Sequence, residues 1–176
     1  SISTGKNLNG KIYGEVLIEY PGKSADDLIR EWIQIIADNS QDPAKLGTPA
    51  VYTTEDGVDL SQMINKVLIG TVPYYQATGK YLTQLFDKGN SAAKEGKTYT
   101  DMEHYWDEAF GYFGAARDYN TYSDSDIKGK VNKDSNSDGK INYNSEYNFS
   151  LAVGAAKRDV GSTSGTVDLT GDIFTA

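Results

Sequence analysis

A short run of carboxylate and amide side chains in the last third of the sequence carries the densest chemical signal. Asp134, Asn136 and Asp138 alternate with serines and are followed at once by Gly139. Alternation can bring the oxygens of the three side chains to one side of the chain, and a glycine permits the sharp turn that follows them. Oxygen ligands of this kind suit a hard divalent cation at about 2.4 Å. The spacing therefore predicts a calcium site.

The run corresponds to the first two-thirds of an EF-hand loop, D-x-[DN]-x-[DN]-G-x-I. In that pattern the carbonyl oxygen of Lys140 is a further ligand, and Ile141 anchors the loop to a core. The twelfth position is Ser145, and the acidic ligand expected there follows one place later as Glu146. Either a one-residue insertion still brings Glu146 to the metal, or the site lacks its strongest ligand and is weak. The remaining alternative is a solvated turn without metal.

We expect residues 134–146 to form an embedded calcium loop with Asp134, Asn136, Asp138, Lys140 and Glu146 as ligands. A calcium sensor pairs two such loops, and this sequence contains one copy. A structural site that ties a long connection to the helices is therefore the favoured interpretation. Its affinity would be as modest as the roughly 10⁻⁴ to 10⁻³ M of extracellular modules.

The only histidine of the chain lies in a second acidic segment. At about 100° per residue, His104 lies on the face opposite an apolar stripe and close to Asp107 and Glu108. These three residues could form half of a transition-metal or acid–base site that another helix completes, with iron or manganese as the suitable metal. The alternative is a solvated acidic face on which His104 only exchanges a hydrogen bond with Glu108. A site with two histidines is excluded by count.

Composition excludes several classes of function. The net charge of −8 argues against a nucleic-acid binder, which needs a basic face. The absence of cysteine excludes disulfides, thiol catalysis and Cys-based zinc sites. No apolar run approaches the roughly 18 residues of a membrane span. Neither H-E-x-x-H nor G-x-S-x-G occurs, so no catalytic residues are assigned. Because the chain begins at Ser1 without a leader, an export signal could have been removed before it.

Helical periodicity predicts the elements that must position these residues. The ambiguous segment 12–18 could be a short helix or a strand, and we favour a helix. Ser24 is the expected N-cap of the next helix, and Pro73 is expected to bend a long one. The remaining predicted helices are 24–38, 58–86, 100–117, a short turn at 123–128, 145–158 and an incipient helix at 168–176. The sequence predicts one all-α domain over residues 1–176, a bundle of about four main helices, truncated at its C-terminus.

The segment 100–114, read with 74–76 before it and 134–147 after it, resembles the imelysin-like domain of unknown function of exported Gram-negative lipoproteins. The run Met-Glu-His-Tyr-Trp-Asp-Glu-Ala-Phe-Gly-Tyr is the most specific part, and the similarity extends over about 58–160. The resemblance implies paired four-helix bundles, of which this chain would be one part. It also implies a location in the periplasm or at the outer-membrane surface, with a lipid anchor outside this chain.

The wider imelysin group is associated with iron uptake, and a G-x-H-x-x-E motif gave it a peptidase-like classification. Carried over to this sequence, His104 matches the histidine of that motif. Asp107 stands where glutamate is expected, Met102 replaces the glycine, and Glu108 is displaced by one position. These departures count against both metal binding and hydrolysis at this segment.

These observations suggest one leading function and two alternatives. The leading one is an exported, non-enzymatic imelysin-like binding protein with a structural calcium site and a role in iron uptake, whose partner is a metal ion. The second is a metal-dependent hydrolase that uses His104 with Asp107 or Glu108 as its base. The third is a surface adhesion or scaffold module that calcium makes rigid.

Overall fold

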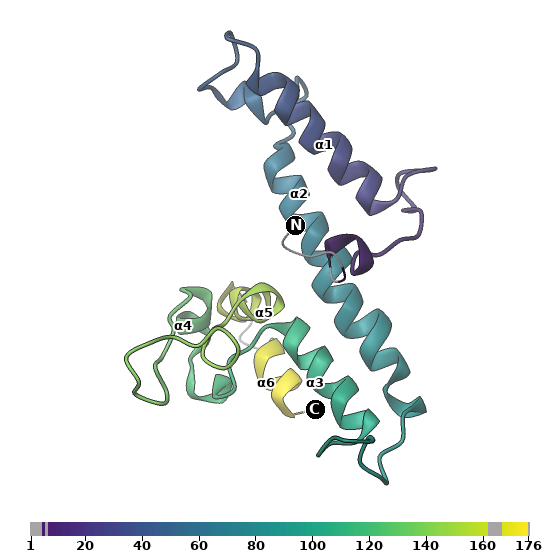
Figure 1. The fold of residues 1–176 in the computed structure, drawn as a ribbon. Coiled ribbons are helices and arrows are strands. Elements are labelled where there is room, and N and C mark those ends of the chain that lie inside the picture. The colour runs from purple at the N-terminus through teal and green to yellow at the C-terminus, as the bar shows by residue number, and fades with distance from the viewer. Residues whose placement is uncertain (1–4, 6, 162–166, 176) are drawn as a thin grey trace. The chain divides into compact units, whose positions relative to one another are not determined.

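The computed structural model describes residues 5, 7–161 and 167–175 (Figure 1). In these ranges the only pairing between extended segments is two isolated bridges, Val16 with Ser24 and Thr53 with Asp59. The long α-helices there are α1 (Ala25–Ser40), α2 (Leu60–Ile69), α3 (Asp101–Phe113) and α5 (Ser150–Gly161); α4 (Asp124–Lys128) and α6 (Leu169–Thr175) are short. The predicted all-α class with about four main helices is confirmed.

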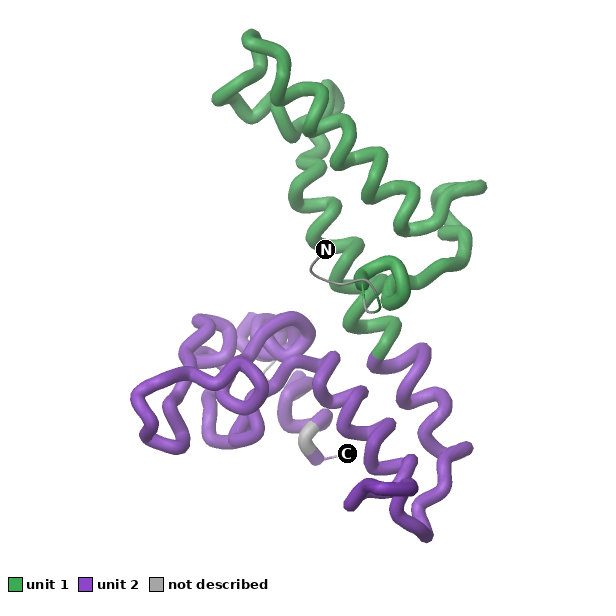
Figure 2. Tube along the Cα trace, viewed as in Figure 1, with its two compact units in different colours: residues 1–76 green, residues 77–176 purple. Residues whose placement is uncertain are grey.

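The described chain divides into two compact units, residues 1–76 and 77–176 (Figure 2). We call them the N-terminal unit and the C-terminal unit and describe each by itself. The prediction of one domain over residues 1–176 stays a prediction.

The N-terminal unit is built on the pairing of α1 with α2. Helix α1 begins with the predicted cap: the Ser24 hydroxyl accepts the Asp27 N–H at 3.2 Å, and the Asp27 carboxylate accepts the Ser24 N–H at 2.9 Å. Leu28 and Trp32 of α1 form a buried cluster with Leu60 of α2. Apolar residues packed around this cluster are Leu17, Ile36, Met63, Ile64 and Val67.

The favoured helix at 12–18 is wrong. Only the 3-10 turn Leu8–Gly10 is helical in this region. The backbone N–H of Tyr13 donates to Thr71 O at 2.7 Å, and that of Leu17 donates to Lys23 O at 2.9 Å. These partners are far along the chain or form a bend, so the donors that a local helix needs are used elsewhere.

The predicted long helix 58–86 is present in three parts. Helix α2 ends at Ile69, the wider π-helix η3 covers Gly70–Leu82, and a 3-10 turn η4 covers Leu85–Asp87. Pro73 has no N–H to donate, and in an α-helix its ring would clash with the carbonyl of Ile69, four residues earlier. The α-helical winding therefore ends at the residue whose carbonyl Pro73 would meet.

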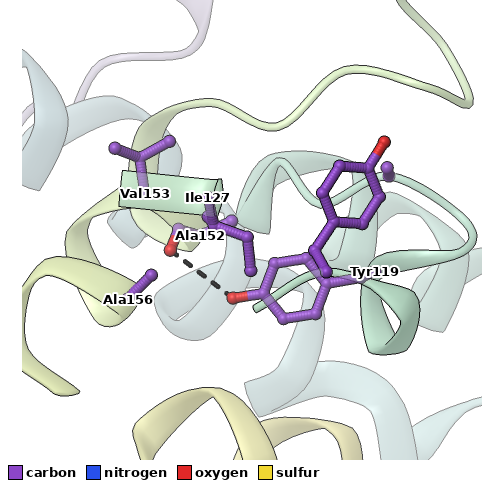
Figure 3. Close-up of a cluster of buried hydrophobic side chains, with 7 residues drawn as sticks. Tyr119, Ile127, Ala152, Val153 and Ala156 are labelled. Atoms are coloured by element: carbon purple, nitrogen blue, oxygen red, sulfur yellow. Dashed lines mark hydrogen bonds between the residues drawn. The ribbon is translucent and has the colours of Figure 1, made fainter. Parts of the chain in front are cut away.

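The C-terminal unit contains the larger core, formed where α4 and α5 meet (Figure 3). Its buried members are Ala116, Tyr119, Tyr122, Ile127, Ala152, Val153 and Ala156. The Tyr119 hydroxyl lies 3.5 Å from Ala152 O and donates a long hydrogen bond to it. Three of these seven residues, Tyr119, Tyr122 and Ile127, come from the mostly polar stretch 118–144.

Helix α3 begins where it was predicted, and helix α4 lies within the short turn predicted at 123–128. Thr100 and Glu103 exchange hydrogen bonds as a capping box before α3, and Ser123 does the same with Asp126 before α4. Helix α3 ends at Phe113 rather than near 117, because Gly114 adopts the left-handed conformation with φ 83°.

Helix α5 begins at Ser150, five residues later than predicted. Residues 145–149, which we call the return segment, are bound instead to the chain that follows α3. Phe149 N–H donates to Gly114 O at 2.8 Å, and Arg117 N–H donates to Ser145 O at 2.8 Å. The buried Asn148 side chain accepts the Ala116 N–H at 2.9 Å. These contacts delay the start of α5.

Helix α6 confirms the incipient C-terminal helix within the described residues. Asp159 of α5 accepts the N–H groups of Leu169 and Thr170, both at 2.9 Å. A carboxylate of another helix thus satisfies the first free donors of α6.

Candidate calcium loop

The predicted loop lies in the C-terminal unit, between α4 and α5. Residues 129–149 form no helix, so neither flank has the helix that an EF-hand places there. The loop is held by its two ends instead. At its entry, Lys133 N–H donates to the Tyr122 hydroxyl at 3.0 Å, and the Lys133 ammonium lies 4.2 Å from the centre of the Tyr122 ring. At its exit, the return segment is bound to the corner after α3.

The structure brings Asp134, Asn136 and Asp138 together at a tight turn. The two carboxylate oxygens of Asp134 accept the N–H groups of Asp138 at 3.1 Å and Gly139 at 2.7 Å. Asn136 Oδ1 accepts the Asp138 N–H at 2.9 Å, and Asn136 Nδ2 donates to Asp138 Oδ2 at 3.2 Å. Because each of these oxygens has about two acceptor positions, one N–H leaves each of them able to meet a cation.

The backbone of the turn depends on two residues with positive φ. Gly139 has φ 82°, as the motif predicts for its glycine. Ser137 has φ 60°, a backbone angle that residues other than glycine rarely adopt. The side chain of Lys140 is exposed, and the backbone N–H of Lys140 donates to Asp138 Oδ1 at 2.9 Å. Ile141 is half-buried.

Glu146 differs from the other predicted ligands because it is buried, with 1 % of its surface exposed. Its Oε1 accepts the Ser135 N–H at 3.0 Å, the Ser135 hydroxyl at 2.8 Å and the Asn136 N–H at 3.2 Å. Its Oε2 accepts the Asn142 N–H at 2.9 Å. The hydrogen bonds from Asn142 and from the Ser135 hydroxyl lower the pKa of the Glu146 carboxyl below its ordinary value, against the effect of burial.

Sequence reasoning missed the two residues that surround this carboxylate. Ser135 and Asn142 occupy positions that the loop pattern leaves variable, so the motif alone gives no sign of them. One feature of the sequence indicates a different role: Glu146 lies one position after the twelfth place of the pattern, so its carboxylate is not where the motif places a calcium ligand.

The second predicted site is arranged differently. The His104 ring stacks on Tyr99, with 5.5 Å between ring centres and 22° between planes. Glu108 accepts a hydrogen bond from the Tyr81 hydroxyl, and Asp107 is exposed. Across the described residues, no three or more His, Cys, Asp or Glu side chains form a group that could hold a metal ion. Neither His104 with Asp107 and Glu108 nor the three acidic residues of the loop, Asp134, Asp138 and Glu146, form such a group.

The apolar stripe predicted behind His104 is only partly correct. Ala109 is buried, but Trp106 is 47 % exposed. Helix α3 instead packs through Tyr105 and Tyr112, whose rings lie 5.3 Å and 5.9 Å from that of Tyr81. The buried face is therefore rotated toward the tyrosines.

A family model described as a domain of unknown function (DUF4856) matches residues 23–148, which include most of the helices and the whole predicted loop. The chain belongs to this family. No curated protein and no solved structure matches it. None of the helices in the described residues combines the length and the apolar character that a bilayer span requires.

Proposed function

We propose that this DUF4856 chain is an exported, non-enzymatic binding protein with an imelysin-like fold, in which residues 134–146 bind one structural calcium ion. Asp134, Asn136 and Asp138 would provide side-chain oxygens, and Lys140 its carbonyl oxygen. The observation that carries the calcium site is the convergence of the first three side chains on one turn, where each keeps acceptor capacity.

The chemistry of these ligands fits calcium. Calcium takes six to eight oxygen ligands and tolerates irregular geometry, so water can complete a set of four protein oxygens. Few formal charges in the set favour weak binding, in the range of extracellular modules. The exported location and the imelysin-like fold are supported by the sequence resemblance over residues 58–160, and a role in iron uptake has the same support.

The position of the loop explains what calcium would do. The entry is bound to Tyr122 of the core, and the exit is bound to the residues after α3. An ion that holds the turn together would therefore fix the connection between α4 and α5. Such an ion acts on stability and does not require catalysis.

Thermal unfolding of the full chain with and without calcium tests the proposal. A ligand of the native state at ten to one hundred times its Kd adds about 1.4–2.7 kcal/mol to the free energy of unfolding, so we expect Tm to rise with calcium up to about 10 mM. Asp138→Ala should abolish the rise. Asp107→Ala removes an exposed aspartate of α3 and should preserve it. A wild-type Tm that does not respond to 10 mM calcium, with no heat of binding in calorimetry, contradicts the calcium site.

A further inference from the structure

Glu146 is an unusual residue for a surface loop, because glutamate is almost never fully buried unless its charge has partners. Its exposed fraction is 1 %. The partners that the structure gives it are four donors from three residues of the loop, Ser135, Asn136 and Asn142. A buried carboxylate with this many donors stays ionised.

The donors come from opposite ends of the loop. Oε1 receives the donors of Ser135 and Asn136 at the beginning, and Oε2 receives the N–H of Asn142 near the end. One side chain thus joins the first turn to the last through the backbone. Of the proposed calcium ligands, Asn136 is one of the residues that are joined, and Asp134 lies next to Ser135.

The same hydrogen bonds limit what Glu146 can offer to a metal. A carboxylate oxygen has about two lone-pair positions, and Oε1 already receives three donors. Bidentate binding of calcium would require Oε1 to release them. That release would leave two backbone N–H groups at the beginning of the loop without the charged acceptor that the structure gives them.

We propose that Glu146 is a positioning residue of the calcium loop: it closes the loop by accepting hydrogen bonds from both ends and does not ligate the ion. The closing role concerns the calcium-free chain, whereas the statement about the ion rests on the proposed calcium function. Glu146 preorganises the ligands, so calcium meets a loop that is already closed.

Amide hydrogen exchange of the ¹⁵N-labelled full chain, measured by NMR in EDTA, tests the closing role with Glu146→Gln. Glutamine has a single acceptor oxygen, and its NH₂ group cannot accept an N–H. The oxygen should occupy the Oε1 position, where three donors converge. We therefore expect the Asn142 amide to exchange roughly tenfold faster or more, as for the loss of a hydrogen bond to a charged acceptor. The amides of Ser135 and Asn136 should keep most of their protection.

A matched control separates this effect from the loss of any carboxylate. Glu103→Gln removes a carboxylate that accepts the Thr100 N–H at 2.7 Å at the start of α3. It should leave the exchange of Ser135, Asn136 and Asn142 unchanged. An Asn142 amide that exchanges equally fast in wild type and in Glu146→Gln overturns the closing role.

Saturating calcium tests whether Glu146 is a ligand. We expect the three amides of the wild type to stay protected, and Glu146→Gln to bind calcium several-fold more weakly with unchanged stoichiometry. Loss of protection at Ser135 and Asn136 when calcium is added would show that the ion takes the carboxylate, and would overturn the proposal. A chain that binds no calcium refutes the proposed function, while the EDTA comparison still supports or overturns the closing role.

Discussion

The carbonyl oxygen of Phe149 lies 2.8 Å from the point where a side chain at Gly114 would begin. Phe149 N–H donates to Gly114 O at the same place, so two segments 35 residues apart meet there backbone to backbone. Only a residue without Cβ permits this approach, and only glycine adopts φ 83° without strain. The end of α3 and the exit of the 134–146 loop therefore depend on one glycine.

We expect Gly114→Ala to lower the free energy of unfolding by more than the roughly 1–2 kcal/mol of the left-handed conformation, because the new Cβ also meets Phe149. Urea unfolding followed by circular dichroism measures this. Gly111→Ala is the matched control, since position 111 lies inside α3 with nothing within 4 Å of a new Cβ. That variant should be more stable than the wild type by up to about 1 kcal/mol. Equal effects of the two variants would contradict the role of the contact.

The packing of the core between α4 and α5 can be tested by shortening one of its buried side chains. Ile127 is 1 % exposed, and its side chain is among the largest that are fully buried. Ile127→Val removes one methylene group and should cost about 0.5–1.5 kcal/mol. The same change at Ile173, which is 42 % exposed, should be close to neutral. Chemical unfolding of both variants at one pH gives the comparison, and a neutral Ile127→Val would show that this core is loosely packed.

Tyr81 predicts a dependence on alkaline pH. Burial, followed by the charge of Glu108 and the hydrogen bond to it, raises the pKa of the Tyr81 hydroxyl to about 12. Because this pKa is raised in the folded state, the contribution of Tyr81 to stability is complete below pH 10 and is lost as the pH rises toward 12. The difference between the tyrosinate absorbance titrations of wild type and Tyr81→Phe isolates this group. Glu108→Gln should move its titration to lower pH, and an unshifted midpoint would refute the coupling.

Asp159 predicts a dependence on acid. Burial alone would raise the pKa of its carboxyl, but hydrogen bonds from Thr170 and Leu169 outweigh burial and lower the pKa. The contribution of these hydrogen bonds to stability is then complete above the ordinary pKa of aspartate and is lost as the pH falls through the lowered pKa. Asp159→Ala should cost about 1 kcal/mol, as for loss of a helix cap, and should speed amide exchange at Leu169 and Thr170. Asp172→Asn, an exposed change on α6, should do neither.

The sequence predicts the starts of helices better than their ends or their packing. Ser24, Thr100 and Ser123 cap helices through residues three positions away, so the information is local. Pro73 likewise acts on a carbonyl four residues earlier. In contrast, the late start of α5 depends on Gly114 and Arg117, which lie some thirty residues before it. No local pattern contains that information.

The candidate site likewise has features that are local in the sequence and features that depend on distant packing. The turn at Asp134, Asn136 and Asp138 is local, and the hydrogen bonds that form it run between these residues and Gly139. That these residues bind calcium stays a prediction. The burial of Glu146 and its donors at Ser135 and Asn142 follow from how the loop closes and how its exit is bound. Likewise, the exposure of Trp106 follows from the packing of α3 on Tyr81, which helical periodicity cannot specify.

Because both ends of the 134–146 loop are fastened to the C-terminal unit, the covalent continuity of the exposed turn between them contributes little to holding that unit together. A single cut by a protease at the exposed residues 136–140 would leave two fragments that remain bound through the exit at Gly114 and through the core between α4 and α5. New chain termini could therefore be placed in this turn, and the rearranged polypeptide would still contain every contact of the core between α4 and α5.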